Sequence, residues 1–193
     1  MSAMVKATSD PQPDVWRLGF WLGLAAAFAT LTAPADAATI GMVAGSGDGV
    51  SRIAATLRTR DLWRREGGSR AAYSLAAEWG LSYWKAEDPG RFATSIIDGS
   101  VTSVLAATFT ASRDLLCYLE TGFGIHLLSR EHIDPDRELG ANFQFGEFIG
   151  GGVRFGAERQ YSLGARIQHV SNGGIASQND GITFVQLMLS RRW

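Results

Sequence analysis

The chain has 193 residues, of which 46% are hydrophobic, with 18 basic and 19 acidic side chains and a formal net charge of −1. This near-neutral balance argues against a nucleic-acid partner, which would require a basic surface. A single cysteine, Cys117, excludes an internal disulfide framework, and the three histidines lack neighbouring ligands at zinc-site spacing.

Residues 1–37 have the pattern of a secretory signal peptide. A polar start that ends at Arg17 is followed by the apolar run 18–31 and by Ala35-Asp36-Ala37, a small-x-small cleavage site. The apolar run is shorter than the roughly 20 residues that a spanning helix needs, which disfavours a single membrane anchor. We therefore expect export, cleavage after Ala37, and one domain over residues 38–193.

The rest of the chain alternates between apolar and polar residues with the period of two that is typical of β-strands. In one segment, for example, Leu119 and Phe123 share a face opposite Glu120 and Gly122. Several segments have 12–16 residues, whereas strands of soluble proteins usually have about 5–6 and a membrane-crossing strand needs about 9–11. We expect strands near 40–46, 50–59, 70–85, 95–109, 114–129, 141–156, 160–171 and 182–193.

The two faces of these strands distinguish a membrane barrel from the alternative, a soluble exported β-sandwich. The apolar faces begin and end with aromatic residues, as in the interfacial girdles of membrane barrels. The final strand alternates up to the aromatic Trp193, which resembles the terminal assembly signal of outer-membrane proteins. The opposite faces carry charges that can pair inside a polar lumen but would be costly as a soluble core: Arg52, Arg58, Arg154, Arg166, Glu78 and Glu120.

We therefore predict an all-β fold, an eight-stranded antiparallel transmembrane barrel in the outer membrane. An even number of strands places both termini in the periplasm, so that the connections 86–94, 130–140 and 172–181 are extracellular and the turn 156–160 is periplasmic. The interior of an eight-stranded barrel is just wide enough for side chains to fill it. The barrel should therefore not be a pore.

His169 and Ser171 are the first candidates for chemistry. Side chains two residues apart on a strand point the same way, so both continue the lipid-facing set that includes Leu163 and Ile167. A serine needs an adjacent base to become a nucleophile, and a histidine two residues earlier on the same pleat can reach it. The spacing alone leaves open that both side chains simply lie in the lipid headgroup zone.

One motif precedes the last predicted strand: His169-Val-Ser171-Asn172-Gly173-Gly174-Ile175, followed by Asn179-Asp180-Gly181-Ile182. It resembles the C-terminal signature of the PagL lipid A 3-O-deacylases, and a weaker likeness extends from Gly41 through Trp79 to Phe145. The resemblance implies an outer-membrane esterase that removes the 3-position acyl chain of lipid A. Its partners would be lipopolysaccharide and outer-membrane lipids, no metal or organic cofactor is implied, and monomer and homodimer both stay open.

The same resemblance assigns roles to the residues of the motif. Ser171 would be the nucleophile and His169 the general base. The oxyanion of the reaction would be stabilised by one or more of the following groups: Asn172, Asn179, and the backbone amides of Gly173 and Gly174.

Thr183 departs from the pattern that the resemblance implies, because family members with a clear third triad member carry a glutamate at this position, 14 residues after the histidine. Threonine can orient an imidazole but cannot offset its positive charge. Either another acid serves, or the chain is a catalytically silent barrel with a structural or adhesion role. Glu147 is a candidate acid: if the turn 156–160 pairs Phe155 with Tyr161, the register places Glu147 directly across from His169.

The other two histidines are weaker candidates. His126 should point into the lumen beside Glu120 as a structural residue. His132 lies in a mixed-charge extracellular loop, where Arg130 and Arg137 either contact phosphorylated sugars or are simply solvated.

Overall fold

The computed structural model describes residues 37–68, 70–87, 95–134 and 137–192, which belong to the second of two compact units of the chain, residues 34–193. The predicted signal peptide, the closing Trp193 and most of the connection 86–94 lie outside this part of the chain. Among the residues described, no helix is long and apolar enough to cross a membrane.

Strands make up nearly all of the regular structure. In chain order they are β1 (Ala37–Gly47), β2 (Val50–Thr59), β3 (Trp63–Glu66), β4 (Ala71–Ala86), β5 (Ser95–Thr110), β6 (Leu115–Leu128), β7 (His132–Asp134), β8 (Arg137–Glu138), β9 (Phe143–Phe155), β10 (Tyr161–Ser171) and β11 (Ile182–Arg192).

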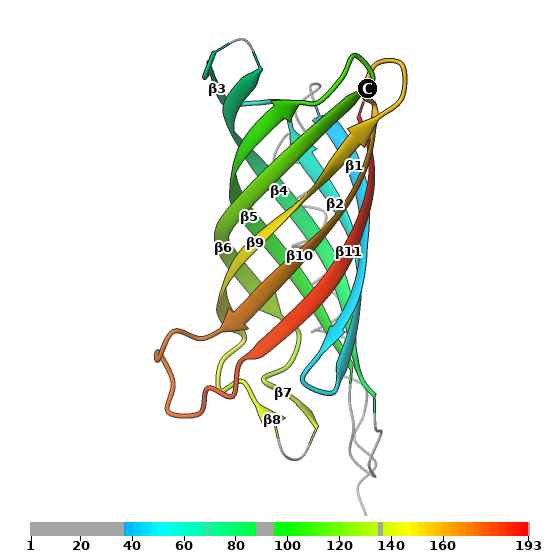
Figure 1. The fold of residues 1–193 in the computed structure, drawn as a ribbon. Coiled ribbons are helices and arrows are strands. Elements are labelled where there is room, and N and C mark those ends of the chain that lie inside the picture. The colour runs from blue at the N-terminus through cyan, green and yellow to red at the C-terminus, as the bar shows by residue number, and fades with distance from the viewer. Residues whose placement is uncertain (1–36, 69, 88–94, 135–136, 193) are drawn as a thin grey trace, which may run out of the picture. The chain divides into compact units, whose positions relative to one another are not determined.

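Eight of these strands close into an antiparallel barrel (Figure 1). The order around the wall is β2-β1-β11-β10-β9-β6-β5-β4, and pairing between β2 and β4 completes the ring. This confirms the predicted eight-stranded fold. By the even strand count, the end where β1 begins and β11 ends is the periplasmic end.

Three short strands were not predicted. β3 pairs with the part of β4 that extends beyond β2, and β7 and β8 form a small hairpin within the predicted connection 130–140. They escape a search for period-two alternation because they contain only four, three and two residues.

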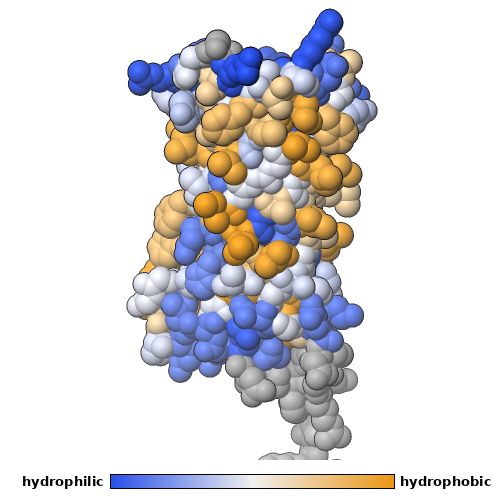
Figure 2. All heavy atoms as spheres, viewed as in Figure 1, coloured by the Kyte–Doolittle hydropathy of each residue, from blue (hydrophilic) through white to orange (hydrophobic). Residues whose placement is uncertain are grey.

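The outward face of the barrel is apolar and exposed. Leu119, Ile149 and Leu187 on three different strands are 62%, 67% and 67% exposed. Figure 2 shows hydrophobic side chains gathered over the middle of the wall and hydrophilic ones at its two ends. An apolar belt of this kind is expected where strands face lipid.

The inward face holds two polar networks. In the first, Arg58 donates to Glu78 at 2.6 Å and to Glu120 at 2.7 Å, and Arg166 donates to Glu78 at 2.9 Å. In the second, the carboxylate of Asp98 accepts a hydrogen bond from Arg52 at 3.3 Å. These ion pairs lie in the lumen as predicted.

His126 belongs to the second network. Its Nδ1 lies 3.0 Å from the carboxylate of Asp98, and its ring is 1% exposed. The prediction of a structural lumen histidine is therefore confirmed, but its partner is Asp98 and not Glu120.

A buried apolar cluster fills the extracellular end of the lumen. Within it, Trp84 packs edge-to-face against Phe184, with ring centroids 5.0 Å apart. The cluster includes Ile133 and Leu139 from the β7–β8 region, so this loop is packed into the barrel mouth. Together with the polar networks, the cluster fills the interior with side chains. The members are Val50, Trp84, Ala86, Ile96, Leu128, Ile133, Leu139, Val170, Ile182 and Phe184.

Candidate active site

β10 places the candidate residues between two neighbouring strands. Tyr161 pairs with Phe155, and from there the register sets His169 directly across from Glu147 on β9. On the other side, His169 lies across from Thr183 on β11. The predicted register of Glu147 is therefore confirmed, whereas a catalytic role for it stays a prediction.

Within the part of the chain that the structure describes, the imidazole of His169 has one hydrogen-bond partner, the hydroxyl of Thr183. His169 Nδ1 lies 2.9 Å from Thr183 Oγ1. Glu147 is exposed, and the described residues include no hydrogen bond or ion pair that it makes. Thr183 thus holds the imidazole through Nδ1, which leaves Nε2 for other chemistry.

Gly181 shows where the other edge of the ring lies. A Cβ built on Gly181 would lie 2.9 Å from His169 Cε1, 3.2 Å from His169 Nε2 and 3.4 Å from Ser171 Cβ. The Nε2 edge and Ser171 therefore border the same small space, which only a glycine leaves open. The sequence motif contains Gly181, but its spacing does not reveal this contact.

The loop 172–181 is organised by Asn172, whose side chain is fully buried. Its amide donates to Leu139 O at 2.9 Å and to Gln178 O at 2.6 Å, and its Oδ1 accepts from Gly174 N at 2.8 Å. Both donor hydrogens of the side chain are thus committed to the loop. The geometry gives Asn172 a structural task, and its predicted oxyanion role stays untested.

Two other predicted oxyanion groups have different surroundings. Asn179 Oδ1 accepts from Asn172 N at 2.9 Å, which fixes the far side of the loop. Gly173 has a positive φ of 66°, and the structure gives its N–H no hydrogen bond within the described residues. The Gly173 amide is therefore the backbone donor closest in sequence to Ser171 that is open to a substrate.

An aromatic surface borders Ser171. Phe145 pairs with Ser171 across β9 and β10. Its ring stacks on Phe123 with centroids 5.9 Å apart and meets Phe143 edge-on at 5.2 Å. This surface faces outward beside the candidate nucleophile, and sequence reasoning did not single it out.

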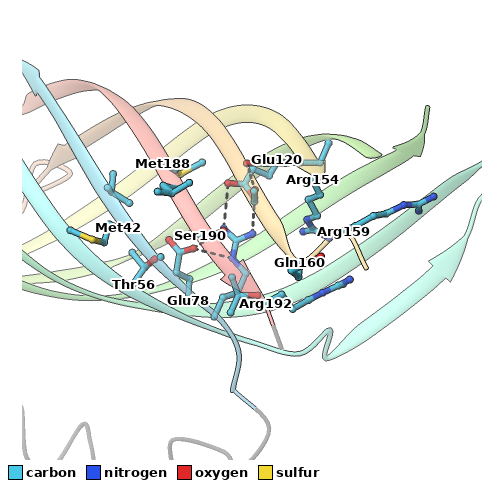
Figure 3. Close-up of a pocket in the computed structure, with 17 residues that line it drawn as sticks. Met42, Thr56, Glu78, Glu120, Arg154, Arg159, Gln160, Met188, Ser190 and Arg192 are labelled. Atoms are coloured by element: carbon cyan, nitrogen blue, oxygen red, sulfur yellow. Dashed lines mark hydrogen bonds and ion pairs between the residues drawn. The ribbon is translucent and has the colours of Figure 1, made fainter. Parts of the chain in front are cut away.

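A cavity inside the barrel lies far from these residues, towards the periplasmic end (Figure 3). Its lining includes Glu78, Glu120, Arg154 and Arg192, and its volume is about 40 Å³. That volume admits a few water molecules, so this cavity could not hold a lipid. A lipid substrate would have to approach from outside the wall.

Comparison with known proteins gives concordant matches. Residues 52–192 match the family model for lipid A 3-O-deacylase (PagL). A lipid A deacylase PagL of Bordetella bronchiseptica is 32% identical over 165 residues, which cover 85% of this chain and 88% of the relative. A lipid A deacylase PagL of Pseudomonas aeruginosa is 30% identical over 161 residues, which cover 82% and 88%.

A solved structure agrees at the level of the fold. The crystal structure of the outer membrane enzyme PagL superimposes with a TM-score of 0.62 at 22% identity, covering 80% of this chain and 99% of that chain.

Proposed function

The chain belongs to the lipid A 3-O-deacylase (PagL) family, and we propose that it hydrolyses the 3-position acyl ester of lipid A. It is an outer-membrane β-barrel. The proposal is carried by one observation: His169 and Ser171 lie together on the outward face at the extracellular end of β10. A lipid in the outer leaflet reaches this position by lateral diffusion.

The chemistry follows from the neighbours of each group. The Ser171 hydroxyl attacks the ester carbonyl while His169 Nε2 takes its proton, and the same proton then passes to the departing sugar oxygen as the ester C–O bond breaks. Water, deprotonated by His169, cleaves the acyl-enzyme and releases the fatty acid. The Gly173 N–H, which lies two residues after the nucleophile, would donate to the oxyanion of each tetrahedral intermediate.

The aromatic surface beside the nucleophile would receive the acyl chain. Phe123, Phe143 and Phe145 present ring faces and edges next to Ser171. Apolar contact along these rings would hold the chain while its carbonyl is presented to the hydroxyl.

Thr183 favours a second candidate, the catalytically silent barrel. It stands where the resemblance places the family's acid, and a triad that loses its acid loses most of its rate even when its geometry stays intact. The two candidates make opposite predictions for lipid A itself.

The test is expression of the intact precursor in a Gram-negative host, with lipid A masses compared between wild-type and Ser171→Ala cells. Loss of one hydroxyacyl chain with the wild-type protein alone supports the esterase. Unchanged lipid A in both strains, with each barrel folded in the outer membrane, supports the silent barrel.

A further inference from the structure

The hydroxyl of Thr183 faces His169, but its backbone faces a carboxylate on the opposite side. Thr183 N donates a hydrogen bond to Asp48 Oδ2 at 2.8 Å. Asp48 therefore joins Thr183, which in turn contacts His169 Nδ1 through its hydroxyl at 2.9 Å. The three residues form a continuous path from a carboxylate to the imidazole.

The β1–β2 hairpin holds Asp48 in this place. Asp48 and Gly49 have φ values of 53° and 75°, the left-handed conformation that Asp-Gly pairs supply in tight hairpin turns. β1 pairs with β11 up to Ser46 and Val185, which brings the hairpin tip beside Thr183. The backbones are in close contact here, because a Cβ on Gly47 would overlap the carbonyl oxygen of Thr183.

We propose that Asp48 is a positioning residue of the active site, which supplies the negative charge that Thr183 cannot. The proposal rests on the esterase function proposed above. By accepting the Thr183 N–H, Asp48 fixes the backbone that presents the Thr183 hydroxyl to Nδ1. Its charge also favours the imidazolium that forms when His169 takes the serine proton.

Asp48 is better placed for this task than Glu147. Both carboxylates are exposed, and Glu147 lies across from His169 in the register, but Glu147 has no hydrogen bond among the described residues. Asp48 is tied to the hydrogen-bond partner of the ring. The alternative is a purely structural role for Asp48, because aspartate favours such turns.

Asp48→Asn separates the two roles. Asparagine suits the same turn, since Asn-Gly is a preferred sequence there, and it keeps an oxygen to accept the Thr183 N–H. Only the charge is lost. We expect kcat on lipid A in detergent micelles to fall about 10- to 100-fold with little change in KM, less than the ~10⁴-fold loss of a directly bonded triad acid.

Thr183→Glu restores the family acid and tests whether Asp48 acts through this position. With a carboxylate next to His169, the additional change Asp48→Asn should alter kcat less than twofold. Rescue of this kind is not expected if Asp48 only shapes the hairpin. Asp114→Asn is the matched control: it removes a carboxylate from an exposed turn between β5 and β6 at the periplasmic end of the barrel, and its kcat should equal that of the wild type. Glu147→Gln tests the competing acid.

The remaining outcomes are decisive as well. Full activity of Asp48→Asn, with Ser171→Ala inactive, overturns the role of Asp48 and leaves the esterase intact. The same holds if Glu147→Gln loses activity instead. If the wild type is inactive and Thr183→Glu is active, the esterase function of this chain and the Asp48 role are both overturned. Inactivity of every folded variant, Thr183→Glu included, overturns the esterase and the Asp48 role together.

Discussion

Gly181→Ala is the substitution that tests the active-site geometry most directly. The new Cβ would lie 2.9 Å from His169 Cε1 and 3.4 Å from Ser171 Cβ. Real Cβ atoms essentially never approach other atoms closer than 3.0 Å, so the imidazole has to move away from its present position. Displacing a catalytic group by about 1 Å costs roughly 100-fold in rate, and we expect kcat/KM to fall by at least that factor.

Backbone strain has to be separated from this effect. Gly181 has a φ of 44°, where a non-glycine residue costs about 1–2 kcal/mol. Gly68 provides the control, because its φ is 111° and nothing lies within 4 Å of its Cβ position. Gly68→Ala thus introduces comparable strain near β3, at the other end of the barrel, without touching the imidazole.

The assay is release of the hydroxyacyl chain from lipid A in detergent micelles, followed by mass spectrometry, with folding verified by circular dichroism. We expect Gly68→Ala to retain wild-type kcat/KM and Gly181→Ala to lose it while both remain folded. Wild-type turnover by folded Gly181→Ala would show that His169 does not act from the position described here.

Three further predictions concern single interactions. Thr183→Val removes the hydroxyl from His169 Nδ1 and should lower kcat about tenfold, the equivalent of about 1.4 kcal/mol, with Thr183→Ser restoring it in the same micelle assay. Asn172→Ala leaves two carbonyl oxygens without their donor and should lower the free energy of unfolding by about 1–3 kcal/mol per group, measured by urea denaturation, with loss of turnover. Glu78→Gln breaks the lumen pairs with Arg58 and Arg166 and should lower that free energy by about 3–5 kcal/mol, with kcat of the folded protein unchanged.

The sequence was sufficient for the barrel because its signals are local and repeated. A period of two assigns each side chain to lipid or lumen, and the short turn 156–160 sets the register of β9 on β10. The position of Glu147 across from His169 followed from these two facts alone. The period of two also predicted that Ser171 shares a face of β10 with His169.

Contacts between distant segments were not predictable in this way. Asp48 and Thr183 are 135 residues apart in the chain, and they meet only because the barrel closes between β1 and β11. Asn172 is of a residue type that can stabilise an oxyanion, yet its side chain is buried and donates a hydrogen bond to the carbonyl of Leu139 in the β7–β8 region. The sequence does not show that this carbonyl lies beside it. The lumen partner of His126 was also misassigned, since parity fixes the face of a side chain but not its neighbours.

The position of Asp48 also has an energetic rationale. A carboxylate on the lipid-facing wall is expensive, and the cost falls towards the interface. Thr183 is an outward-facing residue of β11, so a glutamate there would carry its charge on the face that meets lipid. Asp48 lies instead at the tip of a hairpin beyond the ends of β1 and β2. A charge at the tip stays near water. Asp48 still accepts a hydrogen bond from the backbone of Thr183, whose hydroxyl contacts the imidazole. On the proposal for Asp48, a threonine at position 183 lowers the cost of membrane insertion, and the carboxylate at the hairpin tip orients His169 through its bond to Thr183.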